Sequence, residues 1–452
     1  MRITHLGHAS LLCEVGGVRI LFDPLFIDPH QEGTLTVFPE RTIDLDQLPP
    51  HDVLVLTHHH LDHFDPATLA RLRRDVEVLI PRSAAMQEAL RRLGYESIHP
   101  LDANVSVDLG GATLITTASD VPFPEIGVVL RDAGGTVWNQ VDTIVGAAEI
   151  DEVLRATGGI DLAIAPWQPM LETAAARNEP MQFPTLAYGQ RLADLARLGP
   201  RAVIAGACGF RYDAAPWLNS VVFPQSVERF LDDVVRMMPE LSGSVFEINP
   251  GDVFEVRDGS VMRQPAAAFI RRTPRDPFAL EFSPPPAERV GAAATSGTDE
   301  ERAAVHELCT NGLTAYVASN EAAFAAHRQW QVVLQIEIVW PEGSDFFVLD
   351  FREPSPRCHR GRTPMTNFFC RVAGCALAVL LGGGCTWERL IAAGAFHQHH
   401  RIYGIWSAGI VPPIDVRIEN PLLLMLPDEA NYARMLDREL DRLTTDIPAV
   451  SS

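Results

Sequence analysis

The sequence predicts a two-part α/β protein in which a layered domain of sheet and helices precedes a smaller α+β module. Over roughly the first 265 residues, short runs rich in β-branched residues alternate with helical stretches. Residues 274–302 are rich in proline, alanine, serine and glycine, a composition typical of a linker. We therefore place a first domain at 1–265, a linker at 266–302 and a second domain at 303–452.

The first domain is predicted to hold its sheet between helices. Residues 2–14 and 18–22 read as paired strands around Gly16-Gly17, and 53–57 is a continuous apolar run suited to a buried strand. Further strands are predicted at 76–80, 112–117, 127–131, 136–141, 161–165 and 201–205. Helical patterns occur at 66–73, 83–93, 147–156, 185–198 and 225–237. This alternation favours sheet inside and helices outside.

The second domain is predicted to mix helices with a short sheet. Two helical segments at 300–313 and 320–328 precede two strands at 331–340 and 346–351, the first of which alternates apolar and polar residues. Helices are predicted at 372–381 and 386–393. The histidine-rich stretch 396–400 reads as a solvated helix end, with metal binding as the alternative.

The charge composition excludes several mechanisms. The chain contains no lysine, so all 37 basic residues are arginine, against 58 aspartate and glutamate residues. Chemistry that needs a lysine Schiff base or a phosphate-loop lysine is excluded. Any cationic contact to a substrate must use arginine, whose guanidinium stays charged. The formal net charge of −21 disfavours nucleic acid and anionic membranes as partners.

The cysteines and the lack of long apolar segments predict a cytoplasmic protein. Seven cysteines are scattered, and the five after residue 300 form no Cys-x-x-Cys pair, which favours free thiols in a reducing compartment. The first residues lack the apolar run of a secretory signal, and the nearest candidate for a membrane span, 372–385, is short and broken by three glycines.

The most informative motif is Thr-His-His-His-Leu-Asp-His at 57–63, which follows the buried-strand run. In the order His-x-His-x-Asp-His, His58 and His60 can serve one metal ion, while Asp62 and His63 serve a second. Imidazole and carboxylate ligands suit zinc, iron or manganese. We predict that Asp62 and His63 also take part in catalysis, because acid–base work without lysine falls to carboxylates, histidine or metal-activated water.

The flanks of this motif predict a rigid loop. Asp65 is suited to cap the next helix, and Pro66 suits its first turn. His59, between the predicted ligands, is expected to face solvent or to support a ligand. A surface histidine cluster is the alternative interpretation, and the position of the motif directly after a buried strand counts against it.

The 57–63 motif resembles that of the metallo-β-lactamase fold, an αββα sandwich. Leu-Gly-His-Ala-Ser at 6–10 and Ile-Leu-Phe-Asp-Pro at 20–24 are similar to the opening strands of the branch that contains L-ascorbate-6-phosphate lactonase and N-acyl-phosphatidylethanolamine phospholipase D. The resemblance implies that Asp142 is the aspartate that bridges the two ions, with a helix or turn cap as the alternative. His8 is expected to support a ligand.

The chain departs from that family in its remaining histidines. Hydrolytic members usually have a further histidine before the bridging aspartate and another near the last strand, yet no histidine occurs between His99 and His306. Candidates for the first missing ligand are Asp120 and Glu125. At the last position only Cys208 or Asp213 could coordinate. For each of these four candidates, a purely structural role is the alternative interpretation. Cys208 reads best as a small buried residue.

A closer resemblance is to the CMP-N-acetylneuraminate (CMP-sialic acid) hydroxylase family without its Rieske domain. It rests on Trp-Asn-Gln-Val-Asp at 138–142 and Pro-Arg-Ala-Val-Ile-Ala-Gly at 200–206. It also covers the C-terminal runs at 346–350, 372–381, 385–390 and 397–403. The resemblance implies a sterol-carrier-like second domain. The Cys-x-His and Cys-x-x-His pairs of a Rieske cluster are absent, so an oxygenase would need a separate electron donor.

These observations leave three functions open. A carboxylate-enriched site favours an oxygen-activating hydroxylase or monooxygenase with two iron ions acting on a small molecule; the chloramphenicol-pathway β-hydroxylase is a precedent in this fold. The alternative is a hydrolase of a lactone, lactam or phosphodiester that uses one or two zinc or manganese ions. The third is a degenerate binding protein. Trp167 and Phe210 are predicted to line the pocket, with a core position as the alternative.

Overall fold

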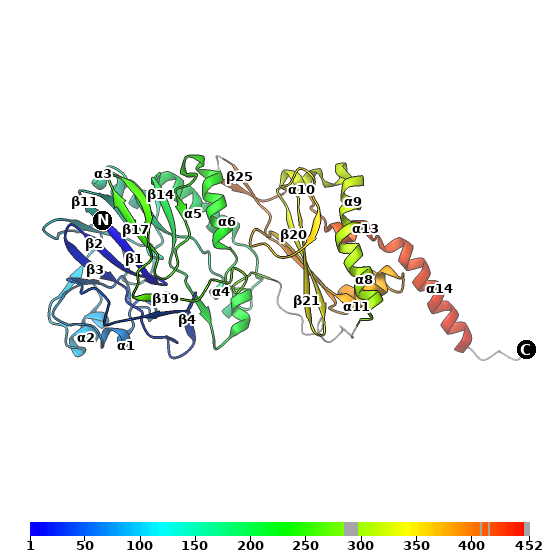
Figure 1. Ribbon diagram of the computed structural model, residues 1–452, viewed down its shortest axis with the longest axis horizontal. Coiled ribbons are helices and arrows are strands. Elements are labelled where there is room, and N and C mark those ends of the chain that lie inside the picture. The colour runs from blue at the N-terminus through cyan, green and yellow to red at the C-terminus, as the bar shows by residue number, and fades with distance from the viewer. Residues whose placement is uncertain (284–296, 407–408, 415, 447–452) are drawn as a thin grey trace, which may run out of the picture. The chain divides into compact units, whose positions relative to one another are not determined.

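The computed structural model describes residues 1–283, 297–406, 409–414 and 416–446. The chain divides into two compact units, Met1–Phe282 with Ile405–Gly409 and Ser283–Gly404 with Ile410–Ser452 (Figure 1). The segment predicted as a linker contains regular structure at both ends, because strand β19 (Ile270–Arg272) pairs with β5 (Arg41–Ile43) and helix α8 (Asp299–Glu307) begins before residue 303. Its middle, 284–296, lies outside the described residues.

Unit 1 contains two large sheets. Figure 1 shows that strands distant in sequence lie side by side, as β1 and β17 do, because antiparallel pairing joins them. The first sheet has the order β18 (Ser260–Gln264), β17 (Val253–Arg257), β1 (Arg2–Gly7), β2 (Ser10–Val15), β3 (Val18–Phe22), β6 (Val53–Val55), β7 (Glu77–Pro81) and β8 (Ile98–Leu101). The second has the order β16 (Val245–Phe246), β14 (Ala202–Gly206), β13 (Leu162–Pro166), β12 (Gly135–Asn139), β11 (Ile126–Asp132), β10 (Thr113–Ala118) and β9 (Ser106–Asp108).

The two sheets pack face to face around an apolar core. Ile20 and Val55 of the first sheet and Leu130 and Ile164 of the second belong to one buried cluster. The short strand β6 is buried along its whole length and pairs in parallel with β3 and β7, as expected for its continuous apolar run. This layer of apolar side chains holds the ends of the parallel strands in fixed positions.

Helices cover the outer faces of both sheets, which completes the predicted αββα sandwich. Over the first sheet, Leu69 and Met86 join the same buried cluster as Leu12 and Leu54. The helices of unit 1 are α1 (Pro66–Leu69), α2 (Ala84–Arg92), α3 (Ala147–Thr157), α4 (Glu172–Arg177), α5 (Thr185–Leu198) and α6 (Val227–Met237), with 3-10 turns η1 (Pro216–Ser220) and η2 (Pro239–Leu241). A small ribbon pairs β15 (Phe210–Tyr212) with β4 (Leu35–Val37).

One difference from the predicted elements concerns the start of the chain. Residues 2–14, predicted as one strand, form two antiparallel strands that turn at His8 and Ala9. His8 adopts a left-handed backbone conformation with φ of 51°, which lets the chain reverse there. The turn places the His8 side chain at the end of the sheet. In one uninterrupted strand, His8 would lie in the middle of the strand instead.

Unit 2 is an α+β module around a five-stranded sheet. The strand order is β22 (Cys358–Arg360), β21 (Gly343–Asp350), β20 (Val333–Trp340), β23 (Phe368–Ala373) and β24 (Phe396–His400). Outside this sheet, strand β25 (Gly404–Trp406) pairs with β26 (Gly409–Val411), and residues 405–409 of this pair are assigned to unit 1. Besides α8, the described helices of unit 2 are η3 (Leu308–Gly312), a π-helical turn, α9 (Leu313–Ser319), η4 (Glu321–Phe324), α10 (Ala325–Gln329), α11 (Gly374–Leu381), α12 (Trp387–Ala392), α13 (Pro421–Met425) and α14 (Asp428–Asp446).

The structure corrects the prediction for the histidine-rich stretch at 396–400. It forms the edge strand β24, paired antiparallel with β23, and does not end a helix. The ring of His399 stacks on Phe369 at a centroid distance of 4.8 Å. The aromatic and β-branched neighbours on β23 stabilise extended backbone here, a tertiary effect that the local helical pattern could not show.

Among the described helices, none is both long and apolar enough to span a bilayer.

We predict that Gly16→Ala destabilises unit 1 by about 2–4 kcal/mol, since a Cβ atom at this position would lie 2.1 Å from the Gly111 carbonyl oxygen and φ is +56°. Gly17→Ala is the matched control. Its φ is +87°, but nothing lies within 4 Å of an added Cβ, so only the backbone strain of about 1–2 kcal/mol applies. Urea unfolding measures both, and equal losses would show that the contact between the two turns is unimportant.

Candidate metal centre

The histidine motif forms a compact loop at the end of strand β6. The amides of His63 and Phe64 both donate to the carbonyl oxygen of His60, at 3.0 and 2.7 Å, which closes a turn. As predicted, Asp65 caps α1, accepting from the Ala67 and Thr68 amides. The helix is one short turn instead of the predicted 66–73, yet it fixes the second end of the loop.

Asp23 anchors the loop to the neighbouring strand. Its side chain is fully buried at the end of β3 and accepts hydrogen bonds from the amide and hydroxyl of Thr57, at 2.8 and 2.7 Å. Its Oδ2 atom also lies 3.0 Å from Nδ1 of His63. A carboxylate there favours the tautomer that carries its proton on Nδ1, so Nε2 of His63 is free to coordinate.

The Nε2 atom of His63 faces two further carboxylates. It lies 3.6 Å from Oδ2 of Asp62 and 3.7 Å from Oδ2 of Asp142. Nε2 of His8 approaches the same Asp62 oxygen, at 3.0 Å, from the β1–β2 turn. Single ligand atoms of His8, Asp62 and His63 lie within 4.8 Å of one another, as do those of His58, His63 and Asp142. These donors converge as metal ligands do.

His58 and His60 form the other side of the site. Nε2 of His58 and Nδ1 of His60 lie 3.0 Å apart, a spacing suited to two ligands of one ion. On the far side of the His58 ring, Nδ1 meets the Thr57 hydroxyl at 3.2 Å and Oε1 of Glu125 at 3.4 Å. Glu125 in turn accepts a hydrogen bond from Ser119, so it is held against the outer nitrogen of His58.

The carboxylates of the site are stabilised by positive charge placed between them. Burial lowers the pKa of His63, but Asp142, Asp62 and Asp23 outweigh burial and raise it to about 10. Burial lowers the pKa of His58 and His60, whose imidazoles are therefore neutral and able to bind a metal at neutral pH. Burial would raise the pKa of Asp62, yet His63 and His8 reverse this and keep the carboxyl ionised.

The residues present fit a metal ion. Nε2 of His63 and Oδ1 of Asp142 are buried and have no hydrogen-bond partner in the described parts of the chain. Burying such unpaired polar atoms costs about 1–3 kcal/mol each, a cost that coordination removes. Nitrogen and oxygen donors of this kind are those that zinc, iron and manganese accept.

The backbone is strained around the same site. Left-handed backbone angles occur at His8, Asp23, Val141, Ala207 and Cys208, which flank or supply the converging side chains. Such conformations cost about 1–3 kcal/mol each for residues other than glycine and concentrate at functional sites. Gly209 lets the loop after β14 approach the first turn, because a Cβ there would lie 3.2 Å from Cα of His8.

A cavity of about 830 Å³ opens over these residues. His8, His60, Asp62, Glu125, Asp142 and Phe210 line it. Phe210 packs edge-on against the His8 ring, with centroids 5.3 Å apart. The structure therefore brings the four ligands predicted from the 57–63 motif and the fifth, Asp142, to one place, together with Glu125 and Phe210.

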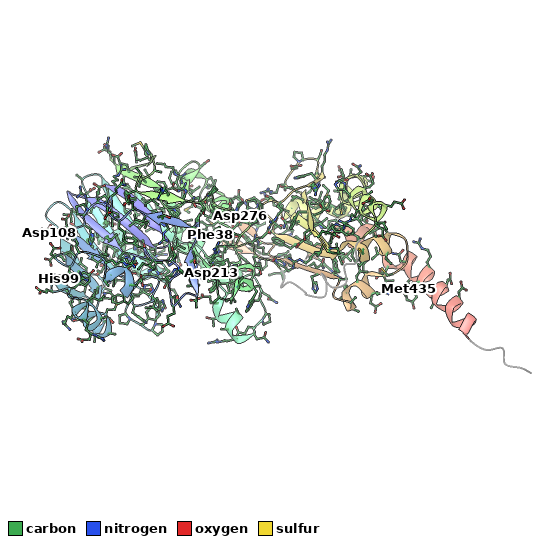
Figure 2. All side chains as sticks on the ribbon, turned by 60° about the horizontal axis from the view of Figure 1, so that its bottom comes forward. Phe38, His99, Asp108, Asp213, Asp276 and Met435 are labelled. Carbon is green, nitrogen blue, oxygen red and sulfur yellow. The ribbon has the colours of Figure 1, made fainter. Side chains whose placement is uncertain are left out.

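Three other predicted residues, Asp120, Trp167 and Asp213, lie outside the cavity lining, whereas Cys208 is part of it. Asp120 is exposed and does not line the cavity, and its backbone amide bonds to Ile144. Trp167 is also absent from the lining, since its indole nitrogen donates to the Ala207 carbonyl oxygen and its ring faces Phe230. Asp213, labelled in Figure 2, accepts from Thr36 and Arg211. Cys208 lines the cavity, and burial raises the pKa of its thiol to about 12.

Sequence reasoning did not assign roles to Asp23, Ser119 and Phe123. Phe123 packs over the histidine loop, 4.9 Å from the His60 ring between centroids. A signal for Asp23 existed, because a charged residue ends the apolar run at 20–24 where a buried strand meets the motif. Ser119 and Phe123 lie in an irregular loop after β10, where no periodic pattern marks a contact.

The sequence profile of the family described as Beta-lactamase superfamily domain matches residues 18–205. This match includes the histidine motif, Asp142 and strands of both sheets, from β3 to β14. Over these residues the chain is similar to this superfamily, and unit 1 has the αββα sandwich of the metallo-β-lactamase fold.

Curated relatives fall into two groups. A protein of Mycolicibacterium smegmatis named as a Rieske 2Fe-2S iron-sulfur protein is 29% identical over 194 residues, 39% of this chain and 37% of the relative. A Salinibacter ruber protein named UPF0173 metal-dependent hydrolase is 30% identical over 153 residues, 32% of this chain and 62% of the relative. The chain thus spans little more than a third of the length of the Rieske-named relatives it matches.

Solved structures with a similar fold include a hydroxylase and a hydrolase. CmlA, a diiron β-hydroxylase from Streptomyces venezuelae, aligns with a TM-score of 0.41 and 18% identity over 58% of this chain and 54% of its own. An isothiocyanate hydrolase from Delia radicum gut bacteria aligns with a TM-score of 0.42 and 13% identity over 57% of this chain and 100% of its own.

We predict that Asp23→Asn lowers the free energy of unfolding by about 1–3 kcal/mol, because an amide cannot accept all three hydrogen bonds that the carboxylate accepts. The pKa of His63 should fall in the same variant, as one of its carboxylate neighbours is lost. Urea unfolding and an NMR titration of the imidazole measure these effects in metal-free protein.

Asp108→Asn is the control for that variant. Asp108, labelled in Figure 2, is exposed and accepts one hydrogen bond from the Gly110 amide. Its replacement should change stability by no more than about 0.5 kcal/mol. Equal losses for the two variants, or an unchanged His63 pKa in Asp23→Asn, would contradict the anchoring role of Asp23.

Proposed function

We propose that the chain is a metal-dependent enzyme and, more narrowly, an oxygen-activating hydroxylase that uses two iron ions on a small-molecule substrate. The observation that carries this proposal is the donor set. Three carboxylates and four imidazoles gather at the site: Asp62, Glu125, Asp142, His8, His58, His60 and His63. The set lacks the two later histidines that are usual in hydrolytic members of the fold and keeps carboxylates beside the imidazoles. Mixed carboxylate and imidazole donors of this kind suit iron and oxygen chemistry, whereas hydrolytic zinc sites rely more on imidazole.

The side chains divide between two ions in this proposal. His58 and His60 would hold one ion through the nitrogen atoms that lie 3.0 Å apart. Asp62 and Nε2 of His63 would hold the other, and Asp142 would be shared. Glu125 would orient His58 from its outer nitrogen, a role that such carboxylates play beside metal-bound imidazoles.

When bound, the two iron ions would supply the electrons and open coordination positions that dioxygen chemistry requires. In the overall reaction a substrate C–H bond becomes C–OH, and the second oxygen atom leaves as water. Two electrons would come from a redox partner, and two protons from water. The Cys-x-His and Cys-x-x-His pairs of a Rieske cluster are absent from this sequence. The relatives named as Rieske proteins suggest an iron–sulfur protein as the donor.

The protein groups around the site would position the substrate and exclude water. Phe123 covers the histidine loop, and Phe210 packs against His8. Both rings would therefore shield the metal ligands from water. The His8 ring is buried and holds the Asp62 carboxylate in one orientation. Rigid support of this kind keeps a carboxylate aligned with its neighbours during a reaction.

A hydrolase is the second candidate, supported by the relatives named UPF0173 metal-dependent hydrolases at 30% and 31% identity. In that case the ions would be zinc or manganese. Asp62 would orient a water molecule for attack on a lactone, lactam or phosphodiester. The His8 imidazole beside Asp62 and His63 favours this candidate, since it partly replaces the histidine that is missing after β14.

Metal content and oxygen consumption distinguish the candidates. We predict about two iron ions per chain after expression with iron. After anaerobic reduction, the protein should consume oxygen in proportion to its iron. His60→Ala should lose most of the metal, whereas His99→Ala, on the exposed surface beside Glu77, should lose none. Bound zinc with no oxygen uptake would favour the hydrolase, and the absence of tightly bound metal would favour a binding protein.

We also predict that metal binding releases at least one proton per chain at pH 7.5. In metal-free protein His63 is protonated, because three carboxylates outweigh burial and raise its pKa to about 10. Metal and proton compete for Nε2, so affinity should rise with pH up to about that value. Calorimetric titration in two buffers with different ionisation enthalpies measures the release. Identical heats in both buffers would contradict the assignment of His63 as a ligand.

A further inference from the structure

The wall of the site cavity contains a single arginine. Arg191 lies on α5 and lines the cavity that Asp62 and Asp142 also line. It is the only arginine among the described residues of the lining, and the chain has no lysine to replace it. The four carboxylates of the lining, by contrast, are Asp62, Glu125, Asp142 and Glu172.

Arg191 has no bonded partner among the residues that the structure describes. Over the described ranges it forms no hydrogen bond and no ion pair, and the carboxylate that acts on it through space is that of Asp142. The neighbouring acids are already engaged: Glu172 accepts from Tyr212, and Asp62 lies 3.0 Å from His8. Arg197 on the same helix shows the usual arrangement, since it pairs with Asp151 at 2.6 Å on the exposed surface.

An unpaired guanidinium in a partly buried wall is a ready site for an anion. Arginine remains charged under these conditions and presents a planar set of donors that matches a carboxylate in two parallel hydrogen bonds. Half-buried charges without partners are uncommon because desolvation is not compensated. A bound anion would provide that compensation.

The other side chains of the cavity wall indicate that the body of the ligand is apolar. Apolar side chains line the cavity between the charged groups: Leu35, Phe123, Ile144, Met170, Phe210 and Leu218. A volume of about 830 Å³ is ample for a small organic molecule. One guanidinium balances one negative charge, whereas a phosphate monoester carries about −1.5 to −2 and would need a second cation.

We propose that Arg191 binds the carboxylate of a monoanionic organic acid with an apolar body, and that acids of this class are the substrates of the metal centre. This inference rests on the proposed function only in its second half, since the anion site itself needs no metal. Arg191 is then a substrate-binding residue that decides between a carboxylic acid and its neutral analogues.

Binding of matched acids and amides tests the inference. The probes are 3-phenylpropionate and octanoate, each paired with its primary amide, and calorimetry on the purified protein gives the affinities. The native chain should bind each acid at least about tenfold more tightly than its amide, the size expected of a charge-assisted hydrogen bond. Arg191→Gln should reduce this ratio to below about threefold. Arg197→Gln should keep the native ratio, because its ion pair lies on the exposed surface.

The outcomes separate the two proposals when metal content is measured on the same samples. An acid preference that depends on Arg191 in protein without tightly bound metal supports the anion site and contradicts the proposed enzyme. Bound metal with no preference for acids overturns the inference and leaves the metal centre standing. A preference that survives Arg191→Gln also overturns it, because the carboxylate then binds elsewhere, for example at the ions. Thermal unfolding of each variant shows that the fold is retained.

Discussion

A buried carboxylate at the end of strand β3 holds the candidate site together. Asp23 has no exposed surface and meets the Thr57 amide, the Thr57 hydroxyl and Nδ1 of His63. It therefore joins two parallel strands and sets the direction of the imidazole that the other donors face. Without this carboxylate, the loop that carries the histidines would have no polar anchor to the neighbouring strand. Packing between the sheets supplies the rigid frame, and Asp23 transfers that rigidity to the ligands.

The second consequence of this arrangement is a concentration of negative charge around one imidazole. Asp23, Asp62 and Asp142 all raise the pKa of His63 against the effect of burial. Such a cluster is stable only with positive charge at its centre, supplied by a proton or by a metal ion. The cavity lining also has more negative than positive side chains, because Arg191 is the one guanidinium of the described lining beside four carboxylates. A metal centre and an anionic ligand would each complete part of this charge pattern.

Local patterns predicted a layered α/β domain, and the family resemblance predicted the αββα sandwich that the structure has. The buried strand at 53–57, the capped helix after it and the ligand spacing at 58–63 depend on neighbouring residues, and the structure contains each of them. The β1–β2 turn was not predicted, because His8 has no glycine-like propensity for φ of 51° and is held there by tertiary packing. Likewise Arg191 reads as an ordinary helix residue until the fold places it in a cavity wall. The strand at 396–400 was mistaken for a helix end for a related reason, since pairing with β23 decides its conformation.

Anomalous X-ray diffraction at the iron and zinc absorption edges tests the central claim most directly. The account predicts two anomalous peaks in unit 1, one between His58 and His60 and one beside Asp62, Nε2 of His63 and Asp142. Scattering at the iron edge would agree with the oxygen-activating function, and scattering at the zinc edge with the hydrolase. Crystals of protein grown with both metals that show no peak at these residues, or peaks only in unit 2, would contradict the metal centre itself.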